Sequence, residues 1–141
     1  INKVNMAVEN EKFIISSYGN NSLIDITDKI RGFVQNCKAK NAVVNLFMKN
    51  EYSSVIILDY TKSLSEDFLN YIKNLIPIDW NKDEISNYDN VFAYARASIL
   101  GKSITFPIKE GKPDLAEGQR IIVVDFNVAP TDIEIIASLI T

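Results

Sequence analysis

The chain has 141 residues, of which 47% are hydrophobic and 23% are charged, and its formal net charge is −3 at pH 7. This length and balance are typical of a soluble globular protein with its own core, and we expect a single domain over residues 1–141. The acidic balance argues against a nucleic-acid-binding surface, which is normally basic. Lysine and arginine are scattered along the sequence, so only folding could gather them into a basic patch.

Two residue counts narrow the chemistry further. The chain contains no histidine, which removes the commonest metal ligand and the usual general base at neutral pH. Its single cysteine, Cys37, excludes a disulfide within the chain. No apolar run reaches the ~18 residues that a membrane-spanning helix needs. We therefore expect a cytoplasmic protein that does not bind a membrane.

The N-terminal third predicts two strands and a helix. Residues 2–8 and 12–17 have strand composition, and the glycine–asparagine run at 19–22 indicates a turn. The helix is predicted to begin at Asp25, which can cap it, with Asp28 close to its positive end. Its apolar positions repeat at helical spacing and predict one buried face. They are Ile26, Ile30, Phe33, Val34 and Cys37.

Cys37 has the spacing of a core residue in this helix. A nucleophilic cysteine needs a base and an electropositive setting, and no histidine exists to pair with it. We interpret Cys37 as structural.

The middle of the chain predicts two strands and a second helix. The strands are at 42–48 and 53–59, and both are mostly apolar. The helix is predicted to begin at Ser65 and to end at Pro77. Its apolar stripe is formed by Leu64, Phe68, Tyr71, Ile72 and Leu75. A polar loop is predicted at 79–90.

The C-terminal part predicts a short helix at 91–100, which ends at Gly101, and then three strands. The strands are at 103–108, 119–126 and 132–140, with a loop at 109–118. The resulting order is ββαββααβββ. Because helices and strands do not alternate regularly, we predict an α+β fold with mainly antiparallel sheet. The very apolar segments 121–124 and 133–140 are either central strands buried on both faces or subunit contacts.

A family resemblance rests first on Ala93–Gly101, which reads Ala-Tyr-Ala-Arg-Ala-Ser-Ile-Leu-Gly and precedes a strand that ends near Pro107. This resembles the signature of the family that includes the bacterial YjbQ proteins, sometimes described as secondary thiamine-phosphate synthases. Further short matches lie in order before and after it, so that the resemblance spans about residues 24–126. They are at Ile24–Asp28, Pro77–Trp80, Leu115 and Gln119.

The family's candidate site is built from three histidines, thought to bind a divalent metal or a phosphate-like anion. The resemblance places Glu51, Lys82 and Tyr94 at these positions. A tyrosine is a poor metal ligand at its normal pKa, and a lysine would add a second cation beside the metal. We therefore expect a degenerate site with no metal and no other cofactor.

Each of these residues has alternative interpretations. Glu51 could be a general base or an anchor for a cationic ligand, but a solvated loop carboxylate is the simpler interpretation. The Tyr94 ring could fill the vacated site, with its hydroxyl paired to Glu51 or Lys82.

Arg96 and the Ser98 hydroxyl could form an anion-binding pocket together with Lys82, since arginine suits bidentate phosphate binding. The alternative is an arginine that braces the short helix through a carboxylate such as Asp83 or Asp89.

The resemblance also implies a homotrimer with sites between subunits. We therefore expect a divergent YjbQ-like protein that acts as a trimeric binding or scaffold subunit. One form of this is a mixed oligomer in which a complete paralogue supplies the histidines. A third class of function is a small-ligand binding module without turnover, which composition does not distinguish from the first.

The alternative is a weak or altered thiamine-phosphate synthase-type enzyme. In that enzyme Lys82 and Arg96 would stabilise the departing pyrophosphate, and Glu51 or Asp59 would hold a hard metal.

Overall fold

The computed structural model describes residues 7–78 and 90–141. These residues form three helices and eight strands. In chain order the elements are β1 (Val8–Ser17), β2 (Ser22–Asp25), α1 (Thr27–Cys37), β3 (Ala42–Met48), β4 (Ser53–Asp59), α2 (Lys62–Leu75), α4 (Val91–Leu100), β5 (Ser103–Lys109), β6 (Lys112–Pro113), β7 (Gln119–Asp125) and β8 (Thr131–Ile140). Among them, no helix is long and apolar enough to cross a membrane.

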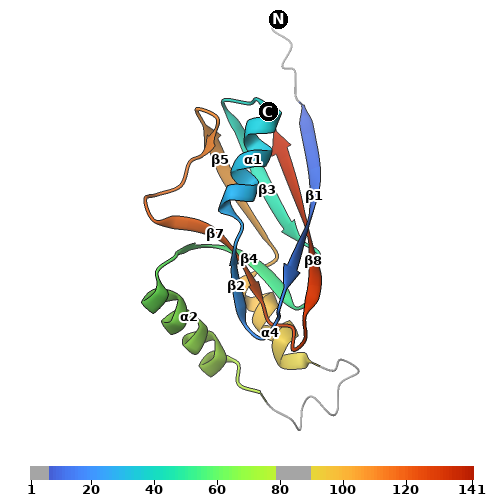
Figure 1. Ribbon diagram of the computed structural model, residues 1–141, viewed down its shortest axis with the longest axis vertical. Helices are drawn as coiled ribbons and strands as arrows, with labels where there is room; N and C mark the ends of the chain where they lie inside the picture. Colours follow the sequence, from blue (N-terminus) through green and yellow to red (C-terminus); the bar gives the residue numbers. More distant parts are fainter. Residues whose placement is uncertain (1–6, 79–89) are drawn as a thin grey trace, which may run out of the picture.

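The strands form two antiparallel sheets. Sheet A has the order β1-β8-β3-β5-β6, and sheet B has the order β2-β7-β4. Figure 1 shows α1 lying across sheet A near one end of the molecule, while α2 and α4 lie near the other end with sheet B. The predicted α+β class with mainly antiparallel sheet is confirmed.

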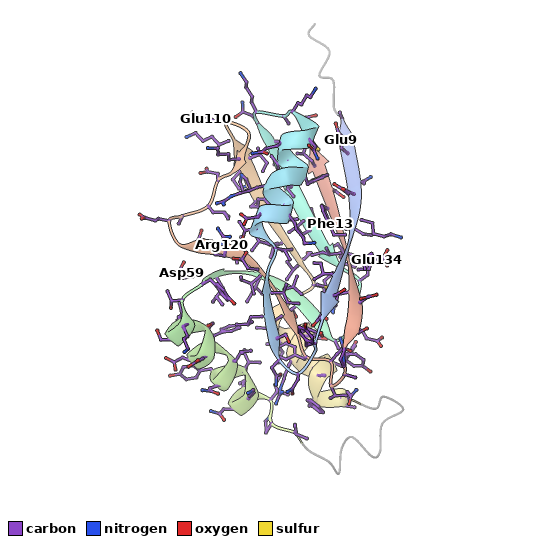
Figure 2. All side chains as sticks on the ribbon, viewed as in Figure 1. Glu9, Phe13, Asp59, Glu110, Arg120 and Glu134 are labelled. Carbon is purple, nitrogen blue, oxygen red and sulfur yellow. The ribbon has the colours of Figure 1, made fainter. Side chains whose placement is uncertain are left out.

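The larger apolar core lies between α1 and the inner faces of the two sheets. Helix α1 contributes Ile30, Phe33 and Val34, all buried. Phe13 of β1 points toward α1 (Figure 2), and its ring meets that of Phe33 edge to face at 6.1 Å. A sheet with one face on this core reads as alternating buried and exposed residues, as β8 does. In β8 the buried residues are Ile133, Ile135, Ala137 and Leu139.

A second, smaller core lies on the other face of sheet B, under α2 and α4. Strand β7 separates the two cores. Ile121 and Val123 belong to the larger core, and Ile122 and Val124 belong to the smaller one. The prediction of a central strand buried on both faces is therefore right for 121–124, but β8 buries only one face.

The N-terminal predictions need two corrections. Strand β1 runs unbroken through residues 8–17 where two strands were predicted, and residues 2–6 lie outside the described residues. Its polar stretch stays in register with β8, because an edge strand tolerates polar side chains on its solvent face. Strand β2 occupies Ser22–Asp25, within the predicted turn and helix start, because it pairs with β7. Helix α1 consequently begins at Thr27 rather than Asp25.

Two further boundaries differ from the predictions. Helix α2 begins at Lys62 rather than Ser65, because the Thr61 side chain accepts the Leu64 N–H and caps the helix three residues earlier. Within the predicted loop 109–118, β6 pairs back onto β5. Glu110 and Gly111 both have positive φ, which suits the tight turn between β5 and β6. Of the predicted loop 79–90, residues 79–89 lie outside the described residues.

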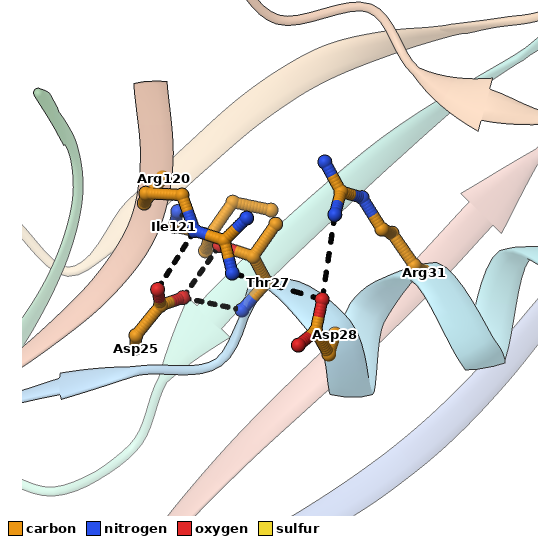
Figure 3. A network of polar contacts seen from close by, with 6 residues as sticks. All are labelled: Asp25, Thr27, Asp28, Arg31, Arg120 and Ile121. Atoms are coloured by element: carbon orange, nitrogen blue, oxygen red, sulfur yellow. Dashed lines mark hydrogen bonds and ion pairs between the residues drawn. The ribbon is translucent and has the colours of Figure 1, made fainter. Parts of the chain in front are cut away.

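The junction of β2 and α1 is held by a polar network (Figure 3). Asp25 accepts hydrogen bonds from the Thr27 N–H at 2.9 Å and from the Thr27 hydroxyl at 2.6 Å, and it pairs with Arg120 Nε of β7 at 2.7 Å. The buried Thr27 hydroxyl in turn accepts the Ile121 N–H at 2.8 Å. Arg120 also lies 3.6 Å from the exposed carboxylate of Asp28. This network fixes where α1 begins on sheet B.

The network also sets the ionisation of Asp25. Burial alone would raise the pKa of Asp25, but the hydrogen bonds from Thr27 and Arg120 outweigh it and hold the pKa below its usual range. The folded pKa is thus lower than the unfolded value of ~3.9. The stability that this carboxylate contributes is therefore present above about pH 4 and is lost as the pH falls through the folded pKa.

We predict that Asp25→Asn lowers the free energy of unfolding by about 1–2 kcal/mol at pH 7, because the charge-assisted bonds are weakened. The gap between variant and wild type should narrow as the pH falls below about 4. Urea unfolding over a pH series measures both effects. Asp28→Asn, at a side chain that is mostly exposed, is the control and should cost less than about 0.5 kcal/mol. A gap for Asp25→Asn that does not change with pH would contradict this account.

Candidate functional site

The structure places two of the three predicted site residues at one end of sheet B. Glu51 is exposed in the turn between β3 and β4. Tyr94 lies in the first half of α4 and is 44% exposed. The start of β4 touches α4 directly, since the Ser54 hydroxyl donates to the Ala97 carbonyl at 2.6 Å. Lys82 lies outside the described residues. The exposure of Tyr94 shows that its ring does not occupy a closed cavity within the chain.

The turn that carries Glu51 is held by a lysine that sequence analysis did not single out. The Lys102 ammonium donates to the backbone carbonyls of Asn50 and Ser53. The Asn50 side chain accepts the Tyr52 N–H at 3.0 Å. Burial lowers the pKa of Lys102, and the nearby Glu51 carboxylate opposes that effect. The carboxylate of Glu51 therefore faces solvent beside a cation that is already committed to the backbone.

Arg96 is buried and hydrogen-bonded within the chain. Its side chain is only 3% exposed, and its Nε donates to the Ile76 carbonyl at 2.9 Å. Its Nη1 lies 3.3 Å from Oδ1 of Asn21, and its guanidinium carbon lies 5.2 Å from the centre of the Phe92 ring. Burial lowers the pKa of Arg96. These contacts join α4 to the end of α2 and to the turn before β2.

Ser98 does not share a face with Arg96. Residues two apart on a helix do not face each other, and Ser98 is exposed whereas Arg96 is buried. The structure therefore does not bring together the two residues predicted to bind an anion. The alternative of a bracing arginine agrees with these contacts, although its observed partners are a carbonyl and an amide. Asp83 and Asp89, the carboxylates considered as partners, lie outside the described residues.

Cys37 lies at the end of α1, half-buried against the larger core. Burial, together with the hydrogen bond and negative charge of Glu9 and the charge of Glu11, raises its pKa to about 11. The thiol is therefore neutral at pH 7 and a poor nucleophile. This agrees with the interpretation of Cys37 as structural.

A buried carboxylate that sequence analysis missed lies at the end of β7. Asp125 is fully buried and accepts a hydrogen bond from the hydroxyl of Ser17 in β1. It also accepts bonds from the Ser53 hydroxyl at 3.0 Å, the Asn127 N–H at 3.0 Å and the Asn127 side-chain amide at 2.6 Å. The same amide lies 3.2 Å from Oδ1 of Asn50. We call these five residues the Asp125 network.

The Asp125 network is structural rather than chemical. The carboxylate is satisfied by four hydrogen bonds from within the chain, so it has little capacity left for a ligand. A surface hollow of about 470 Å³, lined by residues 16–18 and 130–132, lies beside Ser17. One sequence signal could have indicated the network. Asp125 directly continues the apolar strand Ile121–Val124, and a charged residue in that position needs partners.

Comparisons with known proteins agree with this fold. A profile of the family described as UPF0047 protein YjbQ-like matches residues 11–140. The chain belongs to the UPF0047 family of YjbQ-like proteins. The resemblance read from Ala93–Gly101 is therefore confirmed.

Individual relatives are distant but cover most of the chain. A UPF0047 protein from Methanocaldococcus jannaschii is 28% identical over 117 residues, which are 82% of this chain and 83% of that protein. A UPF0047 protein from Methanothermobacter thermautotrophicus is 27% identical over 105 residues, or 74% and 73%. The crystal structure of a YbjQ-like protein of unknown function from Sulfolobus solfataricus P2 is 25% identical, with a TM-score of 0.88 and coverage of 96% and 99%.

We predict that Asp125→Ala lowers the free energy of unfolding by about 2–4 kcal/mol, because several buried donors lose their acceptor. Asp132→Ala is the matched control. Asp132 is an exposed carboxylate bonded to Ser16 at 3.2 Å, and its loss should cost less than about 0.5 kcal/mol. Equal costs for the two variants, measured by urea unfolding, would contradict the structural role of Asp125.

Proposed function

We propose that this chain is a trimeric binding or scaffold subunit of the YjbQ-like family in which the family's histidine site has been lost. The observation that carries the proposal is the burial and hydrogen bonding of Arg96, the arginine of the family signature. It is buried and bonded inside its own protomer, so it holds the fold rather than a ligand.

The residues around the former site support its loss. The chain has no histidine, and Glu51 and Tyr94 both lie at the surface. Within residues 7–78 and 90–141, no group of three or more Cys, Asp or Glu side chains is placed to hold a metal. The proposal therefore assigns this end of the molecule to recognition or assembly.

Exposed apolar side chains support assembly. On α2, Tyr71 is 76% exposed and Leu75 is 64% exposed, although both were predicted to face the core. The outer face of sheet A carries another set, and Val8, Ile140 and Val43 lie in one row across three strands. Contiguous exposed apolar patches mark protein contact sites, and these two sets of residues are the candidates for the contact. The proposal also includes a mixed oligomer in which a histidine-containing paralogue is the partner subunit. It further includes a cytoplasmic location for the protein.

The structure does not favour the enzyme alternative. That alternative relied on Lys82 and Arg96 as cations beside the departing pyrophosphate. Lys82 lies outside the described residues, and the Arg96 guanidinium is already engaged with Ile76 and Asn21. Asp59, one of its two proposed metal ligands, is exposed at the far end of β4 from Glu51, the other one. A thiamine-phosphate synthase role would need a cation other than Arg96.

Light scattering tests the trimer. We predict a mass three times the 15.9 kDa of one chain at micromolar concentration. Leu75→Glu on α2 and Phe47→Glu on the outer face of sheet A each place a charge on one exposed apolar surface. The variant that alters the true contact should lower the mass, because a charge is costly to bury at an interface. A stable wild-type monomer would exclude an obligate trimer.

A further inference from the structure

A groove lined by cations runs between the C-terminal half of α1 and the β5–β6 turn. It consists of two adjoining surface hollows of about 340 and 350 Å³, which share Gln35, Gly111 and Lys112. The first hollow adds Lys38 and Lys40, and the second adds Arg31. We call this feature the basic groove. It lies apart from Glu51, Tyr94 and Arg96, and the proposed function does not use it.

The fold gathers these cations from separate parts of the chain. Arg31 and Gln35 are four apart, so they lie on one face of α1, and Lys38 is the residue that follows the last turn of the helix. Lys112 comes from the opposite wall, beyond the tight turn at Glu110 and Gly111. The two walls are joined by the Gly111 N–H, which donates to the Lys40 carbonyl at 3.1 Å. Figure 2 shows Glu110 at the tip of this turn, beside the end of α1.

The charge of the groove is opposite to that of the chain. Four cations and one carboxylate, Glu110, line the two hollows, although the chain as a whole carries −3. Lys38, Lys40 and Lys112 form no ion pair with any residue in the described part of the chain. Arg31 is paired only with the exposed Asp28, at 3.3 Å. Such an excess of unpaired positive charge in a concave surface raises the local concentration of anions.

The shape of the groove limits the class of ligand that it can bind. Lys112 lies between the two hollows, and each hollow has at least one cation of its own. This arrangement suits two negative groups joined by a short linker rather than a single anion. The lining described above includes no aromatic side chain, so it offers no surface on which a nucleobase could stack. The Gln35 amide can donate to a phosphate oxygen or pair with a hydroxyl between the two charges.

We propose that the basic groove binds a small non-aromatic molecule that carries two or more phosphate groups. One phosphate lies with Lys38 and Lys40, the next lies with Arg31, and Lys112 contacts both. The carbonyls at the C-terminus of α1 repel an anion, because this end of a helix is partially negative. One of them, the Gln35 carbonyl, already accepts the Lys38 N–H at 3.1 Å, which reduces the repulsion.

Titration of the full chain with sodium tripolyphosphate, followed by amide chemical shifts at low salt, tests this proposal. We expect saturable shifts at Gln35 and Gly111, and at least about tenfold weaker binding of inorganic phosphate, which fills one hollow only. Binding should weaken as salt is added.

Matched variants separate this site from general attraction to lysines. Lys38→Gln combined with Lys112→Gln should weaken tripolyphosphate binding by about tenfold or more. Lys62→Gln combined with Lys73→Gln removes the same charge from exposed positions on α2 and should change it by less than about twofold. Equal losses in the two variants, shifts spread over the whole surface, or no saturable shift would overturn the proposal. None of these results would bear on the trimer.

Discussion

The fold depends on how a buried carboxylate at the end of β7 is satisfied. Asp125 accepts hydrogen bonds from Ser17 in sheet A and from Ser53 in sheet B, so one side chain joins the ends of both sheets. A fully buried carboxylate is unfavourable unless such partners are present. The need to supply them fixes where β1 ends and where β4 begins. The turn between β3 and β4 is also held by the Lys102 ammonium, which donates to the backbone carbonyls of Asn50 and Ser53.

The contacts that hold the fold are separate from two of the positions at which the resemblance expects the family's histidines. The Asp125 network and Lys102 hold the turn that carries Glu51, while Glu51 itself faces solvent. Arg96 likewise joins α4 to its neighbours through buried contacts, whereas Tyr94 on the same helix is exposed. Glu51 and Tyr94 are thus surface positions on a scaffold that other residues maintain. Substitutions there have little effect on packing.

Sequence patterns predicted the helices and strands whose apolar side chains repeat at the regular spacing of a buried face. Helix α1 and strands β3, β4 and β7 follow from apolar spacing, because burial of one or both faces imposes that spacing. Strand β2 could not be predicted, since it exists only because it pairs with β7. The Thr61 cap of α2 was a local signal that the later Ser65 obscured. The exposure of Tyr71 and Leu75 on α2 could not be read from their helical spacing.

The candidate site was predictable only in part. The family signature located Tyr94 and Arg96 on one helix, but their opposite burial depends on how α4 packs against α2 and sheet B. The partners of Asp125 come from residues up to 108 positions apart, and no local pattern encodes such pairing. The basic groove also arises only when α1 and the β5–β6 turn meet.

Zinc binding tests most directly the claim that the fold is retained while the histidine site is lost. The wild-type chain and a variant with Glu51→His, Lys82→His and Tyr94→His would be incubated with zinc, dialysed and analysed for metal. The account predicts no stoichiometric zinc in the wild type and close to one zinc per chain in the variant, because three histidines form a sufficient set of ligands. One tightly held zinc per wild-type chain would contradict it.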